Sequence, residues 1–290
     1  MADGDELARS DIVVESIKAE LEKASPTQKQ RIFEAIALAA LGSVPWVGGV
    51  LAAAATYKFG SADIQRDELF KQWLNEHQAK LQMLRATLNE MFDRLEGLGS
   101  EIEERISSEH YLALVRKAFR QWDEADTDEK RRLLVNLITN AAGTRIVSDD
   151  ILRLFLDWID RYHEFHFAVI REVYKNNGPT RYDIWIAVYG GNVPQDSSAD
   201  ADLYKLLIRD LNIGEVIRIA RETDRFGRFK AKSRAPRSAS GAGVLESSFE
   251  DTKPWVLTEL GKQFVHYAMT EVVARIEAKP AEEPKGTSES

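Results

Sequence analysis

The chain has 290 residues, of which 44% are hydrophobic and 30% are charged, and its net charge is −8. This length is sufficient for two domains with hydrophobic cores, and the negative charge argues against a protein that coats nucleic acid with its whole surface. Because the chain has no cysteine, disulfides, thiolate metal sites and cysteine nucleophiles are excluded, which is compatible with a reducing cytoplasm.

The N-terminal segment, MADGDELARSDIVVESIKAE, is acidic and amphipathic and lacks the basic start and apolar core of a secretory signal. It predicts a first helix, capped by Ser10 or Asp11. Ser25-Pro26 predicts the start of a second helix, which runs into an apolar segment. We expect a cytoplasmic protein, and association with the inner membrane depends on that apolar segment.

The apolar segment, Ala35–Tyr57, contains 23 residues without a charge. Pro45 predicts a break near its middle, because proline lacks the helix donor and disfavours helical backbone at the preceding residue. The segment therefore predicts a hairpin of two short arms. It either enters a membrane or lies buried in a helical core, packed through small residues spaced four apart. In the membrane interpretation the contacting residues are Leu41, Val44, Pro45, Trp46, Val47, Val50 and Leu51.

A heptad pattern of apolar residues from Phe70 to Ile102 predicts a long, coiled-coil-like helix over residues 61–106. Gly97 and Gly99 predict a bend or boundary near its end. The apolar seam either packs against other helices of the same chain or forms a homo-oligomer through this helical half. Three further helices are predicted between Ser108 and Gly178, starting at Ser108, Thr127 and Ser148.

The last third predicts three short helices, a strand, a long polar loop, a second strand and a helix. This order is typical of a winged helix-turn-helix domain, here over residues 163–276, after a helical domain over 1–162. The ending Val256–Phe264 (VLTELGKQF) resembles the second wing strand and terminal helix of many bacterial winged-helix proteins. Residues 277–290 predict a disordered tail. The predicted fold class is mainly α, with a helical bundle followed by a small α+β domain.

The polar loop, or wing, is strongly basic. Between residues 218 and 237 it carries two acidic side chains and eight basic ones: Arg218, Arg221, Arg225, Arg228, Lys230, Lys232, Arg234 and Arg237. These residues predict a contact with nucleic acid or with another anionic surface, such as lipid or a protein partner, unless the loop is simply solvated. Asp200 and Asp202 stand at the start of the presumed recognition helix, which argues against base readout.

The sequence has no strong catalytic or cofactor signature. His163 and His166 lie three apart, a spacing that can bind zinc, but packed or capping histidines are the favoured interpretation. The acidic pairs Asp149-Asp150 and Asp157/Asp160 are typical of first-turn and solvated charges. We therefore predict no catalytic residue, no metal site and no cofactor, and expect a protein that is not an enzyme.

The element order, with the segment Ala125–Arg132 (ADTDEKRR) between the long helix and the winged helix, resembles uncharacterised bacterial abortive-infection proteins of the Abi-alpha type. The apolar hairpin beside long helices is similar to α-helical pore-forming proteins. These resemblances imply a non-enzymatic, membrane-interacting bacterial effector of the pore-forming, defence type, with a winged-helix regulatory module. The alternative is a soluble winged-helix DNA-binding transcriptional regulator that dimerises through its helical half.

Overall fold

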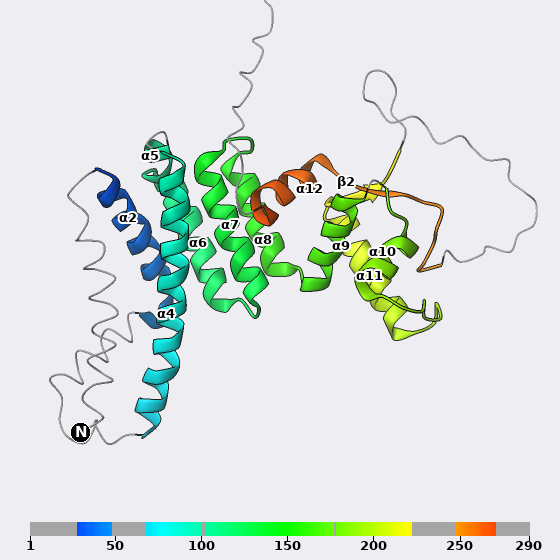
Figure 1. The fold of residues 1–290 in the computed structure, drawn as a ribbon, viewed down its shortest axis with the longest axis horizontal. Coiled ribbons are helices and arrows are strands. Elements are labelled where there is room, and N and C mark those ends of the chain that lie inside the picture. Colours follow the sequence, from blue (N-terminus) through cyan, green and yellow to red (C-terminus); the bar gives the residue numbers. More distant parts are fainter. Residues whose placement is uncertain (1–27, 48–67, 100–101, 177, 222–246, 271–290) are drawn as a thin grey trace, which may run out of the picture. The chain divides into compact units, whose positions relative to one another are not determined.

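The computed structural model describes residues 28–47, 68–99, 102–176, 178–221 and 247–270 (Figure 1). Within these ranges the protein is mainly helical with one small two-stranded antiparallel sheet, which confirms the mainly α fold class. The chain divides into two compact units, residues 1–160 with 267–290, and residues 161–266. The second unit thus begins close to the predicted boundary, but the chain returns to the first unit at Tyr267, before the predicted end at residue 276. The predicted N-terminal helix and tail lie outside the described residues.

The first unit is a set of packed helices: α2 (Gln28–Ser43), α4 (Glu68–Gly97), α5 (Glu103–Ile106), α6 (Glu109–Glu124), α7 (Asp128–Gly143) and most of α8 (Asp149–Arg161). Helix α6 lies between α2 and α7, and α4 also packs on α7 (Figure 1). Ser108 and Thr127 cap α6 and α7, because their side-chain oxygens accept the backbone N–H groups of Tyr111 and Lys130. These two predicted helix starts are confirmed.

The apolar seam of α4 is buried within this chain, at Leu81, Leu84, Leu88, Met91 and Leu95. The helix ends at Gly97, and Gly99 has a φ of +81°, a left-handed conformation that glycine adopts without a steric penalty. Within the described residues, the single helix predicted over 61–106 is therefore two helices, α4 and α5. The glycines mark the boundary as expected.

The second unit contains α9 (Glu164–Lys175), α10 (Arg181–Tyr189), α11 (Ala199–Ile213), β1 (Ile217–Ile219), β2 (Trp255–Leu257) and α12 (Glu259–Phe264). The helix predicted from Ser148 to Gly178 is two helices, because the backbone at His163 is extended and α9 begins after it. Strands β1 and β2 pair antiparallel, with Arg218 opposite Val256. Helix α9 packs against α10, α11 and β2, which places Phe167, Val169 and Ile170 in the core.

The chain returns to the first unit through a short π-helix, η3 (Val265–Met269). Two buried asparagines of α7 bind the carbonyl groups of this segment. Asn136 Nδ2 donates to Ala268 O at 3.1 Å, and Asn140 Nδ2 donates to Tyr267 O and Thr270 O, both at 2.8 Å. The last carbonyls of a helix have no donor within the helix itself, and these amides donate to three of them at the C-terminal end of η3. We call this arrangement the asparagine clamp.

Candidate functional site

The described part of the apolar segment is helix α2 followed by a helical turn at Pro45–Val47. The backbone leaves the helix at Val44, directly before Pro45, which confirms the predicted break. Beyond Val47 the segment lies outside the described residues, and this includes the predicted contact residues Val50 and Leu51. The second arm of the predicted hairpin is therefore not among the described elements.

One face of α2 is buried in the first unit. Ile36, Ala37 and Ala40 are at most 1% exposed, and Val44 and Val47 are 2% and 5% exposed. The small alanine side chains allow α2 to lie close to α6, its main neighbour. Of the predicted membrane-contacting residues, Val44 and Val47 are therefore core residues in this conformation.

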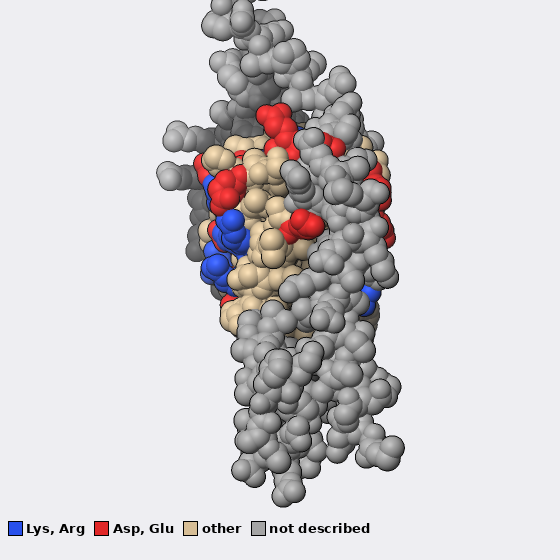
Figure 2. Space-filling view, turned by 90° about the vertical axis from the view of Figure 1, so that its left-hand side faces the viewer, with Lys and Arg blue, Asp and Glu red and all other residues tan. Residues whose placement is uncertain are grey.

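From Ala35 onward the opposite face of α2 is uncharged although it is partly open to solvent, whereas the first two turns of the helix carry Lys29, Arg31 and Glu34. Leu38 is 70% exposed, Gly42 and Pro45 are exposed, and Ala35 and Leu41 are half-buried. In Figure 2 the visible part of the described surface on this side has an uncharged area bordered by acidic and basic side chains. A surface helix ordinarily carries charged residues on its outer face. From Ala35 to Val47, both faces of the segment are thus free of charge.

Trp46 links the described end of the apolar segment to α4 and α6. Its Nε1 donates to Asp123 Oδ1 at 2.5 Å, and its ring meets the His77 ring edge-on at a centroid distance of 5.3 Å. Lys80 Nζ lies 5.9 Å from the Trp46 ring centroid and 3.9 Å from Asp123 Oδ1. We call these four residues the Trp46 anchor. It is a polar attachment at the edge of an otherwise apolar contact.

The basic wing is described only at its first two positions. Arg218 lies in β1 and is half-buried, and Arg221 follows the strand and is exposed. The other six basic residues, from Arg225 to Arg237, lie outside the described residues. Two of the eight predicted contact residues thus lie in β1 and directly after it, and the other six are not among the described residues.

Helix α11 presents an unexpected outer face. Ser198 caps the helix, and Asp200 and Asp202 in its first turn are exposed, as the sequence indicated. The same outer face also exposes large apolar side chains, with Leu203 at 45%, Leu206 at 49% and Ile213 at 68%. The sequence analysis predicted the carboxylates at this position but did not identify these apolar neighbours.

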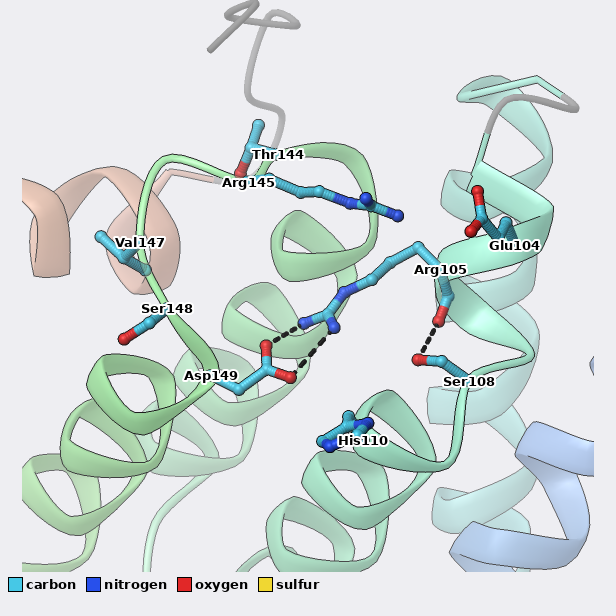
Figure 3. A pocket seen from close by; sticks show the side chains of 9 residues that line it. All are labelled: Glu104, Arg105, Ser108, His110, Thr144, Arg145, Val147, Ser148 and Asp149. Carbon is cyan, nitrogen blue, oxygen red and sulfur yellow. Dashed lines mark hydrogen bonds and ion pairs between the residues drawn. The ribbon is translucent and has the colours of Figure 1, made fainter. Parts of the chain in front are cut away.

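An open pocket of about 290 Å³ lies in the first unit between α5, the start of α6 and the α7–α8 loop (Figure 3). Across it Arg105 forms a two-bond ion pair with Asp149, one bond being 3.1 Å long, and the pair lowers the pKa of Asp149. Figure 3 shows Arg145 extending from the loop toward α5. Arg105 and Asp149 satisfy each other's charge and hydrogen-bonding groups. The primary role of these pocket residues is therefore to link α5 to α8. Sequence analysis missed it, since the two residues are 44 positions apart.

His166 is a buried capping residue. Its Nδ1 accepts the backbone N–H of His163 at 3.1 Å, its ring stacks on Tyr162, and its side chain is 4% exposed. Burial lowers the pKa of His166 to about 4, against a smaller opposite effect of Asp210, whose carboxylate lies 3.9 Å away. Among the residues that the structure describes, no group of three potential ligands is placed to hold a metal ion. The capping interpretation of this histidine pair is thus the one that the geometry supports.

The buried neutral state of His166 predicts a pH dependence. Between pH 6.5 and about 4 the unfolded chain binds a proton that the folded protein does not, so stability falls as the pH is lowered through this window, by at most about 3 kcal/mol. Urea unfolding at pH 7 and pH 4.5 measures this loss. In His166→Asn, whose side-chain oxygen can still accept the His163 N–H, the loss should be smaller. It should not vanish, because burial also lowers the pKa of His266. An unchanged pH dependence in His166→Asn would contradict this assignment.

Among the described helices, none is both long enough and apolar enough to cross a membrane. Comparison with known protein families, with curated proteins and with solved structures finds no match.

Proposed function

We propose that this is a membrane-interacting protein whose uncharged segment, Ala35–Tyr57, is held against the helical unit in one state and contacts lipid in another. The observation that carries the proposal is the uncharged outer face of α2 from Ala35 onward, with Leu38 70% exposed beside an equally uncharged buried face. A helical segment that is apolar on all sides is suited to a fully apolar environment. In the described conformation only one of the two sides of α2 is buried against the helical unit.

The attachment of this segment is compatible with release. Three of the buried side chains, Ala37, Ala39 and Ala40, are alanines, and burial of an alanine contributes less than burial of Ile36, Val44 or Val47. The Trp46 anchor adds a hydrogen bond and a cation–π contact at its edge. Tryptophan also favours the membrane interface, where its ring is apolar and its N–H can reach water. Trp46 therefore suits both states.

The second unit is proposed to be a winged-helix module. Its order of three helices, a strand, residues 222–246, a paired antiparallel strand and a further helix supports this interpretation. In that fold α11 is the recognition helix. Its exposed Asp200, Asp202 and Leu203 argue against direct DNA readout, because carboxylates repel phosphates and leucine has no hydrogen-bonding group. A regulatory protein-binding role therefore fits α11 better than transcriptional control.

Leu38→Glu tests the membrane proposal. Since Leu38 is largely exposed, the substitution should leave thermal unfolding nearly unchanged. A charge within a membrane-inserted segment costs about 2.5 to 3.5 kcal/mol near the bilayer centre, so binding to vesicles should fall by about tenfold or more. Co-sedimentation with vesicles of phosphatidylglycerol and phosphatidylethanolamine, together with dye leakage, measures the effect. Val47→Asp would be a poorer test, because Val47 is buried. This variant would lose stability whether or not the segment enters a membrane.

The matched control is Met83→Glu on α4. Met83 is 44% exposed and lies outside the apolar segment, so this charge should leave vesicle binding intact. Equal loss of binding in both variants would indicate a general electrostatic effect. A parent protein that neither binds nor permeabilises these vesicles would refute the proposed function.

A further inference from the structure

The outer face of α11 carries a compact apolar stripe. Because successive residues of a helix are rotated by about 100°, Leu203, Leu206 and Ile213 fall within an arc of about 80°. The buried face of the same helix, which contacts α9 and β1, is formed by other residues, among them Tyr204, Leu207 and Leu211. The stripe is thus not needed for the fold of the second unit.

Charged groups border this stripe unevenly. Asp200 and Asp202 lie on opposite edges of its N-terminal half and both are exposed. Asp210 lies within the arc and is partly buried toward His166, while Arg209 is the exposed cation beside the C-terminal half. The N-terminal half of the stripe is therefore apolar with a carboxylate on each side. A partner that covers it without leaving unpaired carboxylates must supply cations.

We infer that the Leu203–Ile213 stripe of α11 docks an amphipathic helix of a partner protein that carries lysine or arginine beside its apolar face. A stripe spaced by three and seven residues matches the ridge of a second helix, as in helix-in-groove recognition. The partner's cations lie opposite Asp200 and Asp202. This inference does not depend on the proposed lipid contact, since α11 and α2 belong to different units.

Other occupants fit these residues less well. A second copy of α11, paired antiparallel about Leu206, places Asp202 opposite Asp210, and a parallel pair places each aspartate near its own copy, so both arrangements bring like charges together. Anionic lipid and DNA are repelled by the flanking carboxylates. A cationic helix satisfies both the apolar and the acidic part of the surface.

The test uses the full chain and a fluorescein-labelled helical peptide of about 18 residues, with leucine on one face and lysine on the other. Fluorescence anisotropy at low salt should show binding, and a peptide with glutamate in place of lysine should bind at least about tenfold more weakly. The double substitution Leu203→Ser with Leu206→Ser should weaken binding of the lysine peptide by about tenfold or more. Asp200→Asn with Asp202→Asn should weaken it less and reduce its salt dependence.

Tyr174→Ser is the matched control, because Tyr174 is 61% exposed on α9 and lies outside the stripe. It should leave peptide binding unchanged, and each of these variants should keep a cooperative thermal transition with only a small loss of stability. Equal binding of the lysine and glutamate peptides, or equal loss in the Tyr174 variant, would overturn the inference. A concentration-dependent dimer abolished by Leu206→Ser, or duplex DNA binding abolished by Arg209→Gln, would overturn it as well. The Leu203/Leu206 variant should still bind vesicles, so a failure of the peptide-binding inference can be distinguished from a failure of the proposed membrane function.

Discussion

Gly261→Ala is expected to destabilise the second unit by about 3 kcal/mol, although it adds a single methyl group. Gly261 lies in the first turn of α12, which approaches the backbone of Val216 closely. A Cβ at this position would lie 3.1 Å from the Val216 carbonyl carbon and would overlap its oxygen. A backbone carbonyl has no rotamer to change, so either α12 or the residue before β1 must move.

That movement would break further interactions. Thr258 N donates to the same Val216 oxygen at 3.0 Å, and Thr258 Oγ1 both donates to Glu215 O at 2.5 Å and accepts the Gly261 N–H at 2.9 Å. The cap of α12 and its link to β1 thus depend on the absence of a side chain at residue 261. Urea unfolding followed by tryptophan fluorescence measures the loss, since Trp185 and Trp255 are buried in this unit.

The matched control is Gly97→Ala at the end of α4, where an added Cβ meets no atom within 4 Å. Alanine favours helix over glycine by about 1 kcal/mol, so this variant should be neutral or slightly more stable. If Gly261→Ala unfolded at the same urea concentration as the parent protein, the close approach of α12 to Val216 would be wrong.

Asn140→Leu is expected to cost about 2 to 4 kcal/mol by opening the asparagine clamp. The leucine side chain is similar in size but has no donor, so the carbonyls of Tyr267 and Thr270 lose the Asn140 amide. Loss of a hydrogen bond within a buried site costs about 1 to 3 kcal/mol. Asn136→Leu removes the donor to Ala268 and the acceptor of Arg94 Nη1, and should destabilise the protein in the same way.

Hydrogen exchange locates this effect. In the Asn140 variant the backbone amides of residues 267–270 should exchange faster than in the parent, while those at the start of α7 should change little. Thr139→Val is the control on the same helix. Thr139 is equally buried, but its hydroxyl donates only to Val135 O of its own helix, so little stability should be lost. Equal losses in the Thr139 and Asn140 variants would show that burial rather than the clamp determines the effect.

Local features of this protein follow from short stretches of sequence. The caps at Ser108 and Thr127, the break before Pro45 and the end of α4 at Gly97 are all predicted from adjacent residues, because each depends on backbone groups within about four positions. The mainly helical composition and the position of the apolar seam along α4 follow from apolar periodicity in the same way. A domain boundary was predicted between residues 162 and 163, but the helix from Ser148 was predicted to continue past it to Gly178, since neither glycine nor proline marks the break at His163.

The contacts that define the candidate sites required the tertiary structure. Trp46 meets Asp123 across 77 positions, and Asn140 meets Tyr267 across 127. Nothing in the local pattern of either residue indicates its partner, because such pairs depend on how helices pack. Periodicity identified α2 as apolar, yet only packing decided that Val47 lies inside and Leu38 outside. The sequence thus determined which segments are helical and where most of them end, whereas the burial of each face, and with it the uncharged surface of α2 and the apolar stripe of α11, depended on long-range packing.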